Sequence, residues 1–224
     1  MTRQAALVIA LSAAVLAGCT ATTSGVAKPN PAQLAKPLRS ADLDGVFVAP
    51  EQVSDIVGGT LTLRIDRTRP VGGGPGGPCA GVDTAGADEF VGVGYDAFHV
   101  LVIADGHGNQ HDNIVTESAT VYSDASRAAK QFASASSGLG PCNGRHVRDE
   151  ADWKFAINDV TPDTVLWNKE QTDLPTLWVC YGQGRVRNNA IIEAMVCRGD
   201  DAGAKDADAI LDRMSASVWD LSGT

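Results

Sequence analysis

Cysteine is the residue type whose number and spacing most directly suggest chemistry in this sequence. The chain has 224 residues and five cysteines. Outside the cytoplasm a cysteine can join another in a disulfide or carry a lipid that anchors the chain. Cys19 stands apart from the other four, because it directly follows an uncharged apolar run over residues 5–18. Its position therefore suggests a different chemistry from theirs.

The segment around Cys19 has the features of a cleaved export signal. The apolar run over residues 5–18 is shorter than the roughly 20 residues of a membrane-spanning helix, and Arg3 precedes it. The sequence LAGC, residues 16–19, resembles a bacterial lipobox, in which the cysteine is acylated and the chain is cut before it. We expect a signal peptide over residues 1–18 and a lipid anchor on Cys19, which places the protein on the outer face of the cell membrane. The alternative is a plain secretory signal with a chance cysteine.

The remaining four cysteines form an even set, which predicts two disulfides. Cys180 and Cys197 flank a segment whose midpoint falls between two asparagines, residues 188–189, which suit a two-residue hairpin turn. Counting outward from this turn places the two cysteines opposite each other on neighbouring strands, close enough for a disulfide. A second bridge then joins Cys79 to Cys142. A glycine bulge could shift the register, and a zinc site is the other alternative, although no CxxC spacing supports zinc.

The sequence contains no recognisable catalytic or metal-binding motif. It has no GxSxG and no HExxH, and the glycine-rich stretch at 72–77 lacks the Lys-Ser/Thr that follows in a phosphate-binding loop. His107 and His111 are four residues apart, but the glycines around them predict a turn instead of a metal-binding helix. We therefore expect no enzymatic activity, no metal and no cofactor.

Candidate ligand contacts are polar anchors that could lie beside aromatic walls. Arg185 and Arg187 alternate onto the same face of the predicted hairpin strand. The aromatic residues nearest other predicted strands are Tyr95, Trp153, Trp167 and Trp178. We select Tyr95, Trp153, Arg185 and Arg187 as the ligand-binding candidates, although each of them could instead be a core or ion-paired residue.

The composition is that of a soluble domain, with 44% hydrophobic and 20% charged residues. A formal net charge of −9 argues against binding to nucleic acid and against electrostatic attraction to anionic lipid. Residues 19–39 are rich in Thr, Ala and Pro and have no hydrophobic periodicity, so they predict a flexible tether about 20–25 Å in reach. Residues 40–224 are long enough for one domain with its own core.

Hydrophobic periodicity within this domain indicates strands joined by short loops, with helices between some of them. Strands are predicted at 60–65, 98–104, 113–123, 152–159 and 163–169 and in the cysteine hairpin, and helices at 49–59, 124–138 and 206–221. Because there is no strict βαβ alternation, the pattern predicts an α+β fold, with an antiparallel β-sheet flanked by helices. The two disulfides would brace this single domain.

The order of these features resembles a known family. The EQVSDIVGG helix, a loop cysteine, EFVGVGY, the SDASRAAKQF helix before Cys142 and the RVRNNAIIE hairpin between paired cysteines are similar to the PknH-like extracellular domain. That domain is the sensor of a mycobacterial receptor Ser/Thr kinase and also occurs alone in lipoproteins. The resemblance covers about residues 40–221 and implies two internal disulfides and a cleft for an unidentified ligand. The chain has no kinase domain, so the resemblance does not imply phosphorylation.

Three functional hypotheses follow from these observations. The first is a lipid-anchored, non-catalytic sensor domain that binds a small molecule, a glycan or a protein of the envelope or surroundings. The second is a structural or protein-partner lipoprotein, which would show a large exposed apolar patch instead of a pocket. The third is an unrecognised hydrolase, which would need a nucleophile and a base within hydrogen-bond reach. We favour the first.

Overall fold

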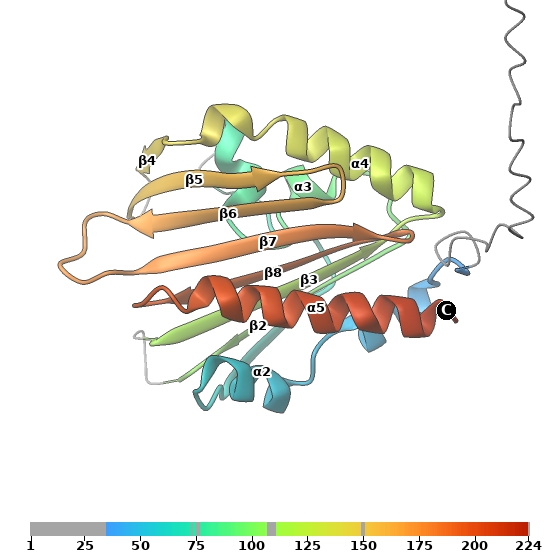
Figure 1. Cartoon of the computed structure of the whole chain (residues 1–224), viewed down its shortest axis with the longest axis horizontal. Coiled ribbons are helices and arrows are strands. Elements are labelled where there is room, and N and C mark those ends of the chain that lie inside the picture. The colour runs from blue at the N-terminus through green and yellow to red at the C-terminus, as the bar shows by residue number, and fades with distance from the viewer. Residues whose placement is uncertain (1–34, 73, 75–76, 107–110, 149–150, 224) are drawn as a thin grey trace, which may run out of the picture.

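The structure is a computed structural model that describes residues 35–72, 74, 77–106, 111–148 and 151–223 (Figure 1). The predicted signal peptide, Cys19, most of the predicted tether and His107 lie outside the described residues. None of the described helices is long and apolar enough to cross a bilayer.

One antiparallel sheet of eight strands forms the framework, as the α+β prediction requires. In spatial order the strands are β1 (Leu63–Arg67), β2 (Ala97–Ala104), β3 (Asn113–Val121), β8 (Ala190–Arg198), β7 (Val179–Arg187), β6 (Thr164–Gln171), β5 (Asp152–Val160) and β4 (His146–Arg148). Neighbours along the chain pair with each other except at β3, which pairs with β8. This pairing joins the first three strands to the last five.

The β7–β8 hairpin has the predicted register. Arg187 pairs with Ala190 and Cys180 with Cys197, with no bulge between them, and the disulfide closes. Asn188 takes a left-handed φ of 52°, which suits the two-residue turn. The second predicted disulfide, Cys79–Cys142, is also present. A glycine is required at position 182, because a Cβ atom there would lie 2.1 Å from the indole ring of Trp167 on β6.

One face of the sheet is covered by the C-terminal helix α5 (Gly203–Leu221), by α2 (Pro50–Val57) and by the 3-10 helix η1 (Ser40–Val46). Figure 1 shows α5 running along the sheet in front of β7 and β8. Its apolar side packs onto alternate residues of β3 and β8, as the helical and strand periods predict. The core on this face is fully buried at Ile210, Met214 and Ile192.

The opposite face is covered by α4 (Ala125–Ser137), the short helix α3 (Asp88–Val91) and the 3-10 helices η2 (Gly77–Val82) and η3 (Gly140–Cys142). The N-terminus of α4 is capped, because the Asp124 carboxylate accepts a hydrogen bond from the Arg127 N–H at 2.9 Å. Phe90 of α3 and Phe132 of α4 pack edge to face and contact the core of β5 and β6. The Cys79–Cys142 disulfide ties η2 to η3 within this layer.

Several short elements were not predicted, and one strand is displaced. The strand expected at 60–65 is β1, Leu63–Arg67, and residues 60–62 before it have no regular secondary structure. The sequence also gave no sign of α3, β4 or the three 3-10 helices, which are too short to show a hydrophobic period. These elements connect or cover the sheet without changing its order.

A candidate ligand-binding cavity at one end of the sheet

A cavity of about 840 Å³ lies at one end of the sheet. It is lined by three segments: residues 111–114 at the start of β3, residues from 171 to 178 in the β6–β7 loop, and residues 198–200 at the end of β8. Because β3, β8, β7 and β6 are antiparallel neighbours, these segments meet at the same end. The β6–β7 loop projects from this end, opposite the C-terminus (Figure 1). The cavity volume falls within the usual range for small-molecule sites.

The apolar part of the cavity wall comes from the β6–β7 loop. Leu174 and Leu177 are 43% and 47% exposed, and Trp178 beside them is half-buried. Trp178 also packs against a small cluster that contains the Cys180–Cys197 disulfide. The disulfide therefore fixes the strand ends from which this wall projects.

Arg198 connects the cavity to both helices on the α5 face. Its guanidinium donates to Asp206 of α5 at 2.6 Å, to Asp200 at 3.0 Å and to the carbonyl of Val57, the last residue of α2, at 3.3 Å. Burial lowers the pKa of Arg198, but the bonds to the two carboxylates outweigh it, so the pKa is raised. Burial raises the pKa of Asp206, against the effect of Arg198. The positive charge of Arg198 is thus compensated within the protein.

Other polar groups at the cavity are not used by the fold. The side chains of Gln171, Thr176 and Asp112 make no hydrogen bond or ion pair with any described residue. Asn113 donates through its Nδ2 to Asp105 at 3.0 Å, while its buried Oδ1 has no partner among the described residues. The Asn113 oxygen is buried, where polar groups are normally paired, whereas Thr176 and Asp112 are exposed and Gln171 is half-buried, so a ligand can reach these three groups.

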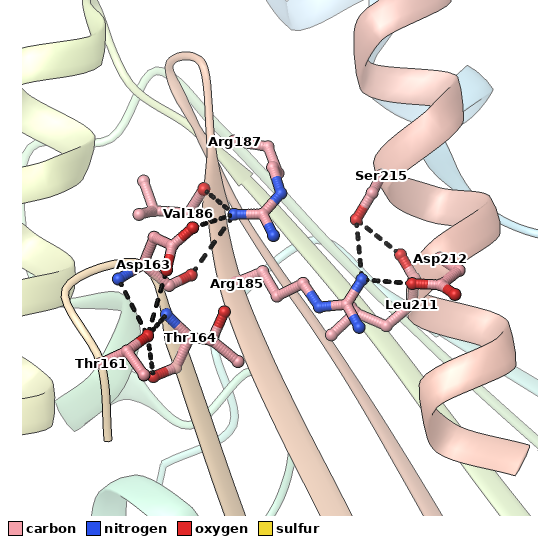
Figure 2. Close-up of polar contacts among 9 residues, drawn as sticks. All are labelled: Thr161, Asp163, Thr164, Arg185, Val186, Arg187, Leu211, Asp212 and Ser215. Carbon is pink, nitrogen blue, oxygen red and sulfur yellow. Dashed lines mark hydrogen bonds and ion pairs between the residues drawn. The ribbon is translucent and has the colours of Figure 1, made fainter. Parts of the chain in front are cut away.

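The predicted ligand contacts Arg185 and Arg187 do not line this cavity, and Figure 2 shows that they point in different directions. Arg185 points toward α5 and forms ion pairs with Asp208 and Asp212, both at 2.6 Å. Arg187 turns the other way and pairs with Asp163 in the β5–β6 turn at 3.0 Å. Both arginines connect elements of the fold, which is the alternative that their sequence pattern left open.

Tyr95 and Trp153 also lie outside the described cavity lining, although both pack against the core cluster on the α4 face of the sheet. Tyr95 packs against Phe98 of β2, with ring centroids 6.1 Å apart. The Trp153 ring carries the ammonium group of Lys169 at 4.5 Å from its centroid, a cation–π contact. The structure therefore does not bring the four predicted ligand residues together.

The sequence indicates Trp178 as an aromatic residue near a predicted strand, but Trp178 is not among the four predicted ligand-binding residues. Arg198 and Gln171 gave no separate signal, because each is a single polar residue at a strand end. The predicted register of the cysteine hairpin could have indicated them. It places the end of β8, with Arg198, beside the start of β7, and β7 in turn pairs with the end of β6.

Two buried glutamates lie in the middle of the sheet, away from the cavity. Glu117 of β3 faces the α5 layer, is 0% exposed and has no hydrogen-bond partner for either carboxyl oxygen among the described residues. Burial raises its pKa to about 8, and the nearby backbone of Val48 opposes this only in part. Glu193 of β8 faces the other layer and accepts from Ser118 at 2.8 Å and from the Gly86 N–H at 2.9 Å. Burial raises its pKa to about 7.

No group of three or more His, Cys, Asp or Glu side chains among the residues that the structure describes is placed to hold a metal ion. His111 meets the backbone carbonyl of Asp105 through its ring Nδ1. This contact belongs to the turn before β3, in agreement with the interpretation of this segment as a loop.

Comparison with known proteins identifies the family. The family model described as PknH-like extracellular domain matches residues 38–216, and the chain therefore belongs to this family. The structure is similar to the crystal structure of the extracellular domain of PknH from Mycobacterium tuberculosis, with a TM-score of 0.72 and 18% sequence identity. The match covers 82% of this chain and 98% of that chain, and shows that the two share a fold. A search of curated proteins finds no match.

Proposed function

We propose that this protein is a lipid-anchored, non-catalytic sensor module that binds a ligand in the cavity at the β6–β7 end of the sheet. Its family consists of extracellular domains, which agrees with a site outside the cytoplasm. The observation that carries the proposal is the cavity itself, where Gln171, Thr176 and Asp112 have no partner in the described part of the fold. These groups are exposed or half-buried at the cavity, so a ligand can reach them without breaking a bond of the fold.

The position of the chain entry supports this arrangement. Lys36 donates its N–H to the Ser222 carbonyl at 3.1 Å, and Asn188 of the β7–β8 turn donates to the Lys36 carbonyl at 2.7 Å. These contacts lie at the end of the sheet opposite the cavity, where α5 also ends (Figure 1). A domain held by a lipid on Cys19 would therefore be attached at one end and carry its cavity at the other. This orientation favours a ligand from the surroundings over a lipid of the anchoring membrane.

A thermal-shift screen of envelope extracts and small metabolites tests the binding proposal. A ligand of the folded state raises the melting temperature in proportion to the logarithm of its excess over Kd. We expect hits whose shift is lost when Leu177 is changed to Ser at the cavity wall and kept when Leu63 is changed to Ser on β1. The two leucines are 47% and 40% exposed, which makes the second a matched control. Hits that are chemically converted, or that survive the cavity change, would contradict a non-catalytic site here.

The anchor is tested separately with Cys19→Ser. The parent protein should partition with membranes and gain the mass of acyl chains at Cys19, while the variant should be released or remain unprocessed. A variant that is processed and membrane-bound like the parent would show that the lipoprotein assignment is wrong.

A further inference from the structure

We infer that the cavity binds a neutral, hydroxyl-rich ligand with one apolar face, that is, a saccharide unit. This inference rests on the proposed function and adds the chemical class of the ligand. It follows from three properties of the lining residues: their net charge, their balance of hydrogen-bond donors and acceptors, and the position of their apolar side chains.

The charges at the cavity argue against an anionic ligand. Arg198 is the one arginine or lysine among the described residues that line the cavity, and Asp200 and Asp206 already compensate it at 3.0 and 2.6 Å. Its Nη1 group also donates to the Val57 carbonyl, so most of its donors are in use. A phosphate or carboxylate would have to displace these carboxylates in a cavity that Asp112 also lines. Such an exchange replaces an internal ion pair and adds repulsion.

The free polar groups are richer in acceptors than in donors. The Asp112 carboxylate only accepts, and the His111 ring, whose Nδ1 donates to the Asp105 carbonyl, keeps its Nε2 as an acceptor in the neutral form. Gln171 and Thr176 can both donate and accept. A ligand that matches this wall must donate several hydrogen bonds and also accept some. Hydroxyl groups do both, whereas phosphate and carboxylate groups only accept.

The apolar side chains select further among donor-rich ligands. Leu174, Leu177 and Trp178 lie together in the β6–β7 loop, while the rest of the described lining is mostly polar and adds one apolar side chain, Ile114 of β3. A ligand with hydroxyls on its edge and C–H groups on its face fits both walls, as a sugar ring does. A small metal cation fits less well, because Asp112 is the one carboxylate of the described lining without a partner, and a single carboxylate supplies too few of the oxygen ligands that such an ion needs.

The test compares three sugars that differ only in charge. A neutral hexose disaccharide, the matched uronic acid and the matched amino sugar are each added at millimolar concentration to the full exported chain, and binding is measured by saturation-transfer NMR. We expect the neutral sugar to bind, the uronic acid to bind at least about tenfold more weakly, and the Asp112→Asn variant to reduce that difference. Binding of the neutral sugar should be insensitive to salt, because no charge pairing is involved.

Two variants examine the apolar wall. Trp178→Ala should weaken binding of the neutral disaccharide about tenfold or more, since aromatic anchors dominate small interfaces. Because Trp178 also packs on the disulfide cluster, Leu177→Ser provides a second change on an exposed side chain, with Leu63→Ser as the matched control. Unfolding curves for each variant establish that the fold is retained.

Three results would overturn the saccharide assignment. The uronic acid could bind more tightly than the neutral sugar, the amino sugar could bind best, or none of a panel of neutral disaccharides could bind at all. Each of these leaves the proposed function separately testable, because the thermal-shift screen identifies cavity ligands of any class. Loss of all cavity-dependent hits in that screen would instead contradict the proposed function itself.

Discussion

The two ends of the sheet use their polar side chains in opposite ways. At the end where the chain enters, Asn189 is fully buried and makes three side-chain hydrogen bonds, two with the backbone of Leu38 at 2.7 and 3.0 Å and one with the Tyr122 carbonyl at 2.6 Å. Asn188 adds bonds to Lys36 and Ser222. The side-chain nitrogens of both asparagines and the Asn189 oxygen thus bond to the entering segment, to the end of β3 and to the end of α5.

At the cavity end, comparable groups are left without protein partners. The Gln171 amide is chemically similar to the amide of Asn189, yet it has no partner among the residues that the structure covers. Asn189 is fully buried and Gln171 half-buried, so the same functional group stabilises the fold at one end and is accessible to a ligand at the other. Which role it takes depends on whether another segment of the chain folds over it.

The middle of the sheet also contains polar groups without partners in the described chain, and there we expect the largest effect on stability. Glu117 also lacks hydrogen-bond partners in the described chain, but it is fully buried and cannot reach a ligand. Its pKa rises from 4.5 to about 8 on folding, and that of Glu193 from 4.5 to about 7. The folded state therefore binds more protons than the unfolded state between these values. Stability should be highest near pH 4.5 and fall by several kcal/mol as the pH rises to about 8.

This loss of stability can be measured by urea unfolding between about pH 5 and 9, the window that the two raised pKa values define. Glu117→Gln should be about as stable as the parent at the acid end and more stable at the alkaline end, and the double variant with Glu193→Gln should flatten the curve further. If the variants kept the parent's pH dependence, the two carboxyls would not be the groups that titrate. Ligand binding at the cavity should be unaffected, because neither glutamate lines it.

The Cys180–Cys197 disulfide supports the cavity end alone and gives the next largest effect. Its sequence separation is 17 residues, for which loop closure contributes about 3 kcal/mol of stability. Changing both cysteines to Ala should lower the free energy of unfolding by about that amount and speed amide hydrogen exchange in β7 and β8 near the cavity. Equal acceleration around Asn188 and Asn189 would show that the two ends are not independent.

Asn189→Ala is the corresponding change at the other end, with a smaller expected effect. It removes three hydrogen bonds and leaves buried backbone groups of Leu38 and Tyr122 unpaired, so we expect a loss of about 2 kcal/mol or more by urea unfolding. Ligands found in the thermal-shift screen should still bind once the variant is folded. A loss of binding without loss of fold would place the site at the wrong end of the sheet.

The sequence predicted the strands and the hairpin at the two ends of the sheet, but not how the polar side chains at each end are used. The register of the β7–β8 hairpin followed from the two asparagines and the cysteine spacing, since turn length fixes register. The further bonds from Asn188 and Asn189 to the entering segment were not predictable, because their partners are about 150 residues away in the sequence. Short elements such as α3 and β4 also carried no period to recognise.

The same limit explains the ligand residues. Arg185 and Arg187 were reasonable polar anchors, but their acidic partners lie on α5 and in the β5–β6 turn, and only the tertiary fold brings them together. The cavity in turn depends on β3 pairing with β8, a contact between distant parts of the chain that no local pattern indicates. Paired segments could be predicted from the sequence, whereas the groups that remain unpaired after folding could not.

The most direct test of this account is to map a bound ligand onto the two ends of the sheet by NMR. Backbone amide signals of the folded chain are assigned, and a ligand from the thermal-shift screen or the neutral disaccharide is titrated in. We predict chemical-shift changes at residues 111–114, at 171–178 and at 198–200, with none at 188–189 or at Ser222. Changes confined to the Asn188–Asn189 end, or spread over the surface without saturating, would contradict a ligand site at the cavity.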